Sequence, residues 1–466
     1  MYIYDTLHKT KLLFEPIIDG EVSIYLCGPT VYDNAHLGHA RSSLSFDLLV
    51  RTLKALGYNV TLAQNFTDVD DKIITKIQET GKTLKEITEY YISSYKQEMS
   101  ALHIQEASLQ PKATESMEAI EEMILKLINL GFAYRVESGD VYFDTSKDSL
   151  YGSISHRVAD DAVTQSRIEV NQVKKNPKDF ALWKACSSQD TICFDTQLSS
   201  GRPGWHIECS AMIAKHFVGT QEYSIDIHAG GADLLFPHHE NEASQSRCAS
   251  GHELSKYWMH NGFVQIDGEK MSKSLGNSFF LKDALNIYDG EILRYYLGSV
   301  HYRNDFNFNE EDLLTSKKRL DKLYRLKKRV TPSKASTVAK GFQKALLDAM
   351  SDDLNVSVAL SVIDQMVAET NERLDNNPKE KALKKEVLAN IDYIFELLGF
   401  GGKEPYEYFQ IGVDQELKEQ IEALILQRTQ AKKEKDFALC DALRDELESM
   451  DIMIMDTHQG TVWEKI

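Results

Sequence analysis

The sequence predicts a mixed α/β fold that begins with a β-α-β unit and includes a long helical region nearer its end. Apolar and polar residues alternate from Val22 to Leu26, which is the period of a strand. Gly28, followed by a proline, ends this pattern, and apolar residues recur at roughly helical spacing from about Ala35 to Leu56. A second apolar run, from Tyr58 to Ala63, predicts the next strand, and helical spacing prevails again from Leu313 to Leu398.

Length and composition narrow the class of protein. With 466 residues, of which 42% are hydrophobic, the chain has room for two to four domains with ample cores. No apolar run is long enough to span a membrane, and the first residues do not read as a signal peptide. The 6 cysteines lack the spacing of a disulfide framework. We therefore expect a cytoplasmic protein that contacts no membrane and whose cysteines are reduced.

The net charge of −18 argues against nonspecific binding of nucleic acid. It does not exclude an RNA partner, because the distribution of charge matters more than its sum. One basic stretch, from Lys317 to Arg329, contains Asp321 as its only acidic residue. A solvated helix face is the commoner explanation for such a run.

Two histidines stand at the start of the first predicted helix. His36 and His39 lie three residues apart in the segment GPTVYDNAHLGH, and Gly38 between them allows a ligand close to the backbone. A helix N-terminus carries unpaired N–H groups and a partial positive charge, so it attracts phosphate. Taken alone, the pattern fits two surface histidines at a helix cap equally well.

Two further segments suit a nucleotide. The pentapeptide KMSKS spans Lys270 to Ser274, and its lysines, flanked by small hydroxyl residues, suit a loop over a triphosphate. A strand predicted from Tyr223 to His228 runs into Gly230 and Gly231, and glycines after a strand let a flat nucleotide lie against the backbone. Most Gly-Gly pairs are turns, however, so this second segment is weak support by itself.

HLGH together with KMSKS resembles the signature pair of class I aminoacyl-tRNA synthetases, usually written HIGH and KMSKS, and Leu37 conserves the volume of the usual isoleucine. Cys27 and the segments GWHIECS and FPHHENE extend the resemblance to the cysteinyl-tRNA synthetase family, from Tyr4 to Trp463. The resemblance implies a Rossmann-like catalytic domain that is split by a connective insertion. An α-helical bundle and a small C-terminal mixed domain would follow it.

The expected domain boundaries follow from that resemblance and from breaks in the sequence pattern. We expect a catalytic domain over residues 1–312, with the connective insertion at about 116–200 and the KMSKS region at about 260–312. A helical bundle that binds tRNA would occupy residues 313–402, and a small anticodon-binding domain would occupy residues 403–466.

A metal site is implied by residues scattered along the chain. His238 and Glu242 lie four residues apart just after Pro237, which favours the first turn of a helix, so they should share one face. By itself this pair reads as a salt bridge. The resemblance implies that Cys27, Cys209, His238 and Glu242 hold one zinc ion. Because zinc deprotonates a coordinating thiol, such a site would separate cysteine from serine, whose hydroxyl is a far poorer ligand.

The resemblance also implies a reaction and the residues that serve it. Cysteine and ATP, which Mg²⁺ accompanies, would form cysteinyl-adenylate, and the cysteinyl group would then pass to the 3′ end of tRNA(Cys). The residues assigned to ATP are His36, His39, Gly230, Asp233, Lys270 and Lys273. Those assigned to the bound cysteine are Thr67, Trp205 and His228. We expect the chain to act as a monomer.

The segment FALCDALRDEL, from Phe437 to Leu447, carries an apolar helical stripe. Asp441 and Arg444 lie three residues apart, and by spacing alone a weak surface ion pair is the favoured interpretation. The resemblance instead implies that this segment reads the anticodon. Phe437 would then stack on a base, at a position where tryptophan is the more frequent residue.

Two other functions stay open. A ligase of the same fold that joins cysteine to a small amine, as in mycothiol biosynthesis, would need the metal and both phosphate motifs but no C-terminal tRNA-binding domain. A non-catalytic tRNA-binding or zinc-stabilised interaction protein would need neither motif. The intact HLGH and KMSKS segments argue against that last function.

Overall fold

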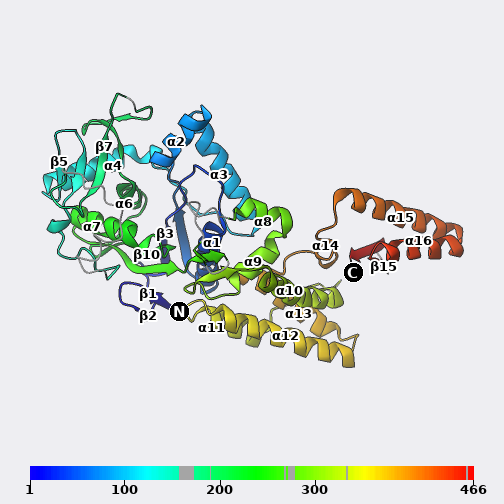
Figure 1. Ribbon diagram of the computed structural model, residues 1–466. Coiled ribbons are helices and arrows are strands. Elements are labelled where there is room, and N and C mark those ends of the chain that lie inside the picture. The colour runs from blue at the N-terminus through cyan, green and yellow to red at the C-terminus, as the bar shows by residue number, and fades with distance from the viewer. Residues whose placement is uncertain are drawn as a thin grey trace. The chain divides into compact units, whose positions relative to one another are not determined.

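The computed structural model describes residues 1–156, 173–188, 190–266, 269–270, 279–331, 334–457 and 460–465 (Figure 1). The chain divides into two compact units. The first unit comprises Met1–Asp283, Leu297–Asn309 and Leu347–Ala359. The second comprises Ala284–Tyr296, Glu310–Leu346 and Leu360–Ile466.

A four-stranded parallel sheet forms the centre of the first unit. Its strands are β3 (Glu21–Leu26), β4 (Asn59–Gln64), β10 (Tyr223–Gly231) and β11 (Glu253–Asn261), in the spatial order β11-β10-β3-β4. From β3 the chain moves outward to β4, and from β10 it moves outward in the opposite direction to β11. The boundary between β3 and β10 is therefore a switch point, which is where open α/β sheets bind their ligands.

The predicted β-α-β unit is confirmed. α1 (Leu37–Ala55) connects β3 to β4, and His36 is its N-cap. Val22, Ile24 and Leu26 of β3 are at most 2% exposed. These three side chains share one face of the sheet, and Tyr25 on the other face is also fully buried. Burial on both faces is usual for a strand in a parallel sheet, whose two faces are both covered.

Other elements of the first unit surround this sheet. A hairpin of β1 (Tyr2–Asp5) and β2 (Thr10–Leu13) precedes it in the chain. The helices are α2 (Asp71–Thr80), α3 (Leu84–Ala101), α6 (Trp205–His216) and α7 (Glu240–Ser250). A small sheet contains β12 (Val264–Ile266), β13 (Glu269–Lys270) and β14 (Phe306–Phe308). α8 (Leu281–Ile287) and α9 (Gly290–Gly298) each contribute residues to both units.

The segment between the two halves of the central sheet, called the insertion below, forms a helix and an antiparallel sheet. α4 (Met117–Asn129) ends before Gly131, whose φ of 81° favours glycine. The strands are β5 (Ala133–Arg135), β6 (Val141–Phe143), β7 (Phe180–Ala185), β8 (Phe194–Asp195) and β9 (Ser200–Pro203), in the order β5-β6-β7-β9-β8. Trp183 of β7 is fully buried in the core between this sheet and α4.

A disulfide joins Cys186 to Cys193, which corrects the expectation that the cysteines are reduced throughout. β7 and β8 both pair with β9, and the N–H of Cys186 donates to the carbonyl of Ser200 at 2.9 Å. This pairing brings the end of β7 next to the residue before β8. The sequence could not reveal the bridge, because neither cysteine spacing nor composition shows that the two strands share a neighbour. The other cysteines are free.

The second unit is mainly helical. Its bundle contains α10 (Glu310–Val330), α11 (Lys340–Met350), α12 (Val356–Asn376), α13 (Lys381–Leu398) and the short α14 (Pro405–Tyr408), although the end of α11 and the start of α12 count with the first unit. The C-terminal part contains α15 (Gln415–Glu434), α16 (Phe437–Ser449) and a hairpin of β15 (Ile452–Thr457) and β16 (Gly460–Lys465). Within the described part of the chain, no helix is both long and apolar enough to cross a membrane.

Four of the eight basic residues in the stretch on α10 form ion pairs within their own unit. Arg319 pairs with Asp364 and Arg329 with Asp375 of α12. Lys327 donates to the carbonyl groups of Gly401 and Lys403, both at 2.7 Å, and Lys317 and Lys328 are also in ion pairs. Much of this stretch therefore holds helices and loops together, rather than forming only the solvated face that charge runs usually provide.

We predict that Asp226 of β10 is a strong determinant of stability. Its buried carboxylate accepts hydrogen bonds from the N–H of Ile17 at 2.6 Å, and from the N–H and the hydroxyl of Ser23 at 2.7 and 2.6 Å. Each buried donor left without an acceptor costs about 1–3 kcal/mol. Asp226→Ala should therefore lower the free energy of unfolding by about 3 kcal/mol or more, measured by urea denaturation.

The matched control is Asp352→Ala, which removes a carboxylate that is 52% exposed and pairs with Lys11. An exposed pair of this kind contributes about 0–1 kcal/mol. Equal destabilisation by the two substitutions would show that the buried acceptor has no special role.

Candidate metal centre and nucleotide pocket

Four side chains that can bind a metal meet at the carboxyl ends of β3 and β10. Cys27 follows β3, Cys209 lies in α6, and His238 and Glu242 lie in the turn η3 (Leu235–His239) and in α7. One ligand atom from each of the four lies within 4.8 Å of the others. His238 Nε2 is 2.8 Å from Glu242 Oε1. Cys27 Sγ is 3.5 Å from the same oxygen, and Cys209 Sγ is 3.7 Å from His238 Nε2. The residues assigned to zinc from the sequence therefore form one buried cluster.

Three local features position these ligands. The N–H of Cys27 donates to the carbonyl of Ala229 at 3.1 Å, so the pairing of β3 with β10 fixes the thiol beside the sheet. Cys209 lies in the second turn of α6, which begins at Trp205. Regular helix α7 begins at Glu240, and the residues before it form a wide turn in which Phe236 is extended. His238 and Glu242 meet across this turn.

Burial and mutual charge set the protonation of the cluster. Hydrogen bonding to Cys27 lowers the pKa of Cys209 to about 6, whereas burial raises the pKa of Cys27 well above its usual value. Burial alone would lower the pKa of His238, but Glu242 and Cys209 raise it to about 10. Burial likewise opposes ionisation of Glu242, but His238 and His228 hold its pKa well below the usual range. At neutral pH the metal-free cluster therefore combines two anions with one cation. A bound metal cation would take the place of the proton on His238.

A second set of potential ligands shares two members with the first. It comprises Cys27, His228, His239 and Glu242, again within 4.8 Å of one another. His228 Nε2 lies 2.7 Å from Glu242 Oε2. His239 Nδ1 lies 2.8 Å from His260 Nε2, whose Nδ1 lies 2.8 Å from the hydroxyl of Thr6. His228, which the sequence analysis assigned to the bound cysteine, thus contacts the carboxylate of Glu242.

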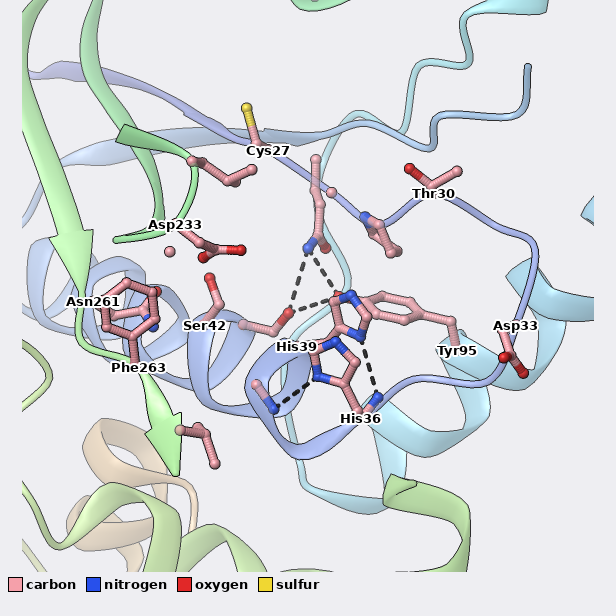
Figure 2. A pocket seen from close by; sticks show the side chains of 18 of the residues that line it. Cys27, Thr30, Asp33, His36, His39, Ser42, Tyr95, Asp233, Asn261 and Phe263 are labelled. Carbon is pink, nitrogen blue, oxygen red and sulfur yellow. Dashed lines mark hydrogen bonds between the residues drawn. The ribbon is translucent and has the colours of Figure 1, made fainter. Parts of the chain in front are cut away.

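A pocket of about 300 Å³ opens beside the cluster (Figure 2). Cys27, His36, His39, Trp205 and Asp233 all line it. Its wall also includes Gly28, Gly38, Gly231 and Lys72. One cavity therefore brings together a candidate metal ligand, the N-terminus of α1 and residues that follow β10.

His36 and His39 cap the helix on which they stand. His36 Nδ1 accepts from the N–H of Gly38 at 3.1 Å, and His39 Nδ1 accepts from the N–H of His36 at 3.2 Å. The two rings stack with their centroids 3.7 Å apart. Because a neutral imidazole that accepts at Nδ1 carries its proton on Nε2, both rings have an N–H donor on the side away from the helix cap.

Of the other predicted residues, Trp205 lines the pocket. Thr67, His228 and Gly230 are not part of its lining. Trp205 is 39% exposed and stacks on His238, with ring centroids 4.1 Å apart. Thr67 is buried, and its hydroxyl accepts a weak hydrogen bond from the side-chain amide of Asn65 at 3.4 Å. At Gly230 a Cβ would lie 2.8 Å from Cε1 of His239, so this glycine allows close packing behind the pocket wall. Its neighbour Gly231 lines the pocket itself.

Many pocket residues were not found from the sequence, among them a hydrogen-bonded group of three. The hydroxyl of Tyr95, on α3, lies 2.7 Å from Ser43 Oγ, and Gln64 donates to the same hydroxyl at 2.9 Å (Figure 2). Tyr95 is buried, which raises its pKa to about 12. No motif marks these residues, because they reach the pocket from three different elements. His206 was also missed, although its place between Trp205 and Cys209 in GWHIECS offered a cue.

The remaining predicted residues lie in KMSKS and on α16. Lys270 belongs by its backbone to β13, whereas its side chain and the whole of Lys273 lie outside the described residues. On α16, Phe437 is 67% exposed, and Asp441 and Arg444 are also exposed. Cys440, Leu443 and Leu447 of the same helix are buried. The helix thus buries these three apolar residues, whereas Leu439 and the three predicted residues are exposed to solvent.

Three family models match different parts of the chain. Residues 13–318 match the family model of the class I tRNA synthetase (C) catalytic domain. Residues 345–401 match the DALR domain, and residues 414–463 match the cysteinyl-tRNA ligase anticodon binding domain. Among solved structures, the chain is similar to Mycobacterium tuberculosis methionyl-tRNA synthetase in complex with methionyl-adenylate, with a TM-score of 0.59 and 14% identity over 82% of this chain and 92% of that one. That likeness supports the fold.

Relatives with similar sequences extend over the whole chain. It is 72% identical over 465 residues to the cysteine–tRNA ligase of Sulfurovum sp. (strain NBC37-1), with 100% of both chains covered. It is 56% identical over 467 residues to that of Helicobacter pylori (strain P12), again with 100% of both covered. Since the catalytic-domain model also spans more than half of the chain, the chain belongs to the cysteine–tRNA ligase family of class I tRNA synthetases.

Proposed function

We propose that this chain activates cysteine with ATP to give cysteinyl-adenylate and then transfers the cysteinyl group to the 3′ end of tRNA(Cys). The observation that carries the proposal is that Cys27 lines the same pocket as His36 and His39. The cluster of candidate metal ligands and the N-terminus of α1, which attracts phosphate, therefore border the same cavity. An aminoacyl-adenylate needs both, since it joins an amino acid to a phosphate.

The cluster fits a zinc ion. Zinc is bound by cysteine sulfur, histidine nitrogen and carboxylate oxygen, usually four ligands at a time. Cys27, Cys209, His238 and Glu242 supply that donor set from buried or half-buried positions within 4.8 Å of one another. When bound, zinc would offer a Lewis-acid position that a thiolate occupies far more strongly than a hydroxyl does.

Selection of cysteine needs such chemistry because shape cannot provide it. Cysteine and serine differ by one atom, and pockets discriminate poorly between near-isosteres. In this proposal Trp205, Thr67 and His228 surround the rest of the bound amino acid. Trp205 is the best placed by position, since it lines the pocket and also covers the ring of His238.

The nucleotide would lie along the N-terminus of α1. His36 and His39 accept at Nδ1, so their Nε2–H groups can donate to phosphate oxygens. The helix dipole adds positive potential at the same place. Lys270 and Lys273 would approach the phosphates from KMSKS, and Mg²⁺ would accompany ATP. Asp233, together with the backbone near Gly230, would hold the nucleoside.

We further propose that the second unit binds tRNA. A bundle over residues 313–402 and a domain over residues 403–466 would contact the tRNA, and the exposed residues of α16 would read the anticodon. Unstacked anticodon bases are open to side-chain contacts that duplex bases do not offer. A ligase that joins cysteine to a small amine would have no use for this surface.

The free thiols suggest a location. Cys27 and Cys209 Sγ lie 4.0 Å apart and are not bridged. Oxidation of this pair would remove two metal ligands, so we propose that the chain works in the reducing cytoplasm. We also propose that it acts as a monomer. The Cys186–Cys193 bridge lies in the insertion and uses none of the proposed ligands.

Cysteine-dependent ATP–pyrophosphate exchange tests the proposed activation step. The chain should catalyse exchange with cysteine, and exchange with serine should be slower by a factor on the order of 10⁴, because the metal site prefers a thiolate. Exchange with serine at a comparable rate would disprove selection by the metal. Absence of exchange with any amino acid would disprove amino-acid activation.

Substitution of one ligand tests the metal site. Cys209→Ser should lower zinc affinity at least about a hundredfold, since one thiolate contributes several kcal/mol to a site worth roughly 10 kcal/mol or more. Cysteine binding, followed by calorimetry, should weaken with it. Cys248→Ser is the control, because Cys248 is free and lies outside the cluster. Full zinc content by atomic absorption in Cys209→Ser would remove this residue from the site.

Phe437→Ala and Arg444→Ala test the anticodon surface. Base–aromatic stacking is worth about 1–3 kcal/mol, so Phe437→Ala should lower kcat/KM for tRNA about tenfold or more while ATP–pyrophosphate exchange is unchanged. Arg444→Ala should act in the same direction. Leu426→Ala on α15 removes another exposed apolar side chain and should change neither rate. If charging of tRNA is unaffected by both α16 variants, this helix does not read the anticodon.

A further inference from the structure

His206 contacts His238 at the ring nitrogen of His238 that points away from the metal cluster. Their Nδ1 atoms lie 2.9 Å apart. On the opposite side of the His238 ring, Nε2 lies 2.8 Å from Glu242 Oε1 and 3.7 Å from Cys209 Sγ. His238 therefore contacts the cluster through Nε2 and contacts His206 through Nδ1.

Only one proton can lie between two nitrogens at this distance. Whether His206 or His238 carries this proton determines whether His238 can bind a metal ion. If His238 carries the proton on Nδ1, its Nε2 keeps a lone pair for a metal ion. If His206 carries it, a neutral His238 has its proton on Nε2. That proton would point at Glu242 Oε1, and the ring could not coordinate. The tautomer of His238 thus decides whether the cluster is complete.

Packing fixes both rings. The indole of Trp205 stacks on His238 with an interplanar angle of 17°. The ring of Phe180 in β7 packs against His206 at 85° and a centroid distance of 5.5 Å. The side-chain amide of Gln245 donates to the carbonyl of His206. Neither ring can turn without disturbing a neighbour, so the nitrogen–nitrogen contact is a fixed part of the fold.

We propose that His206 is a positioning residue of the metal centre. Its Nδ1 accepts the Nδ1 proton of His238 and thereby leaves the Nε2 lone pair of His238 for the ion. Outer partners of this kind orient metal-bound histidines in many proteins. His228 makes a parallel contact, since its Nε2 lies 2.7 Å from Glu242 Oε2 and orients the carboxylate. The inference rests on the proposed zinc site, but it concerns a residue that would not touch the ion.

Two substitutions separate the acceptor from the packing of the ring. His206→Phe keeps an aromatic ring against Phe180 and Trp205 but has no acceptor. His206→Asn loses the ring but places an amide oxygen near the position of Nδ1. His216→Phe, on the same helix but exposed at its last residue, is the matched control. Zinc affinity of the full chain is measured by competition with a chelator, and Co²⁺ absorption spectra report the ligand geometry.

We expect His206→Phe to weaken zinc binding about 10- to 100-fold. His206→Asn should recover most of that loss, and His216→Phe should match the unsubstituted chain. In the Co²⁺-loaded chain, His206→Phe should weaken the visible absorption that reports tetrahedral coordination. Zinc affinity of His206→Phe within about threefold of the unsubstituted chain would overturn the inference. Equal losses in His206→Phe and His206→Asn would also overturn it, since packing alone would then explain the effect.

Two further measurements keep the result interpretable. Circular dichroism of the metal-free variants checks that each is folded, and His206→Leu is a second acceptor-free variant if His206→Phe does not fold. If the unsubstituted chain takes up no zinc, the proposed metal site itself is wrong. If it takes up zinc and supports cysteine-dependent exchange while His206→Phe and His206→Leu bind zinc equally well, only the role of His206 is wrong.

Discussion

The parallel pairing of β3 with β10 is the constraint on which the rest of the catalytic unit depends. It sets Cys27 beside Ala229 through one backbone hydrogen bond, so a thiol near the N-terminus meets a turn and a helix that follow β10. Cys27 and Glu242 are 215 positions apart in the chain. The same switch point opens the pocket next to α1. One strand pairing therefore places the four candidate metal ligands next to the pocket at the N-terminus of α1.

Electrostatics then explains why the cluster is surrounded by so many polar groups. Two thiols, an imidazole and a carboxylate gathered away from water would each favour the neutral form. Here Glu242 stays ionised because His238 and His228 contact it, whereas burial and the neighbouring Cys209 keep the thiol of Cys27 neutral. Every such charge needs a partner, because an unpaired buried charge costs several kcal/mol. His228 is one such partner, and its contact with Glu242 also restricts how that ligand can turn.

Local features of this chain could be predicted from its sequence, whereas contacts between distant segments could not. The strand, helix and strand that start the fold follow from apolar periodicity, and His36 was placed at a helix start by its motif. Whether the basic residues of α10 form ion pairs depends on partners such as Asp364 of α12, and no pattern in α10 reveals these partners. Likewise, no pattern in the sequence shows that Tyr95 lies in the pocket beside Ser43. The Cys186–Cys193 bridge required knowledge that β7 and β8 share a neighbouring strand.

The insertion supports the candidate metal centre as well as separating the two halves of the sheet. Its last strand, β9, ends at Pro203, and α6 begins two residues later with Trp205. At Gly204 a Cβ would lie 1.9 Å from the carbonyl oxygen of Ala181, so the chain enters α6 pressed against β7. The register of β7 and β9 therefore sets the start of the helix that carries Cys209. A change in the insertion sheet would displace Cys209 and Trp205 together, and through His206 it would reach His238. The position of the candidate metal ligand Cys209 therefore depends on the packing of the insertion sheet.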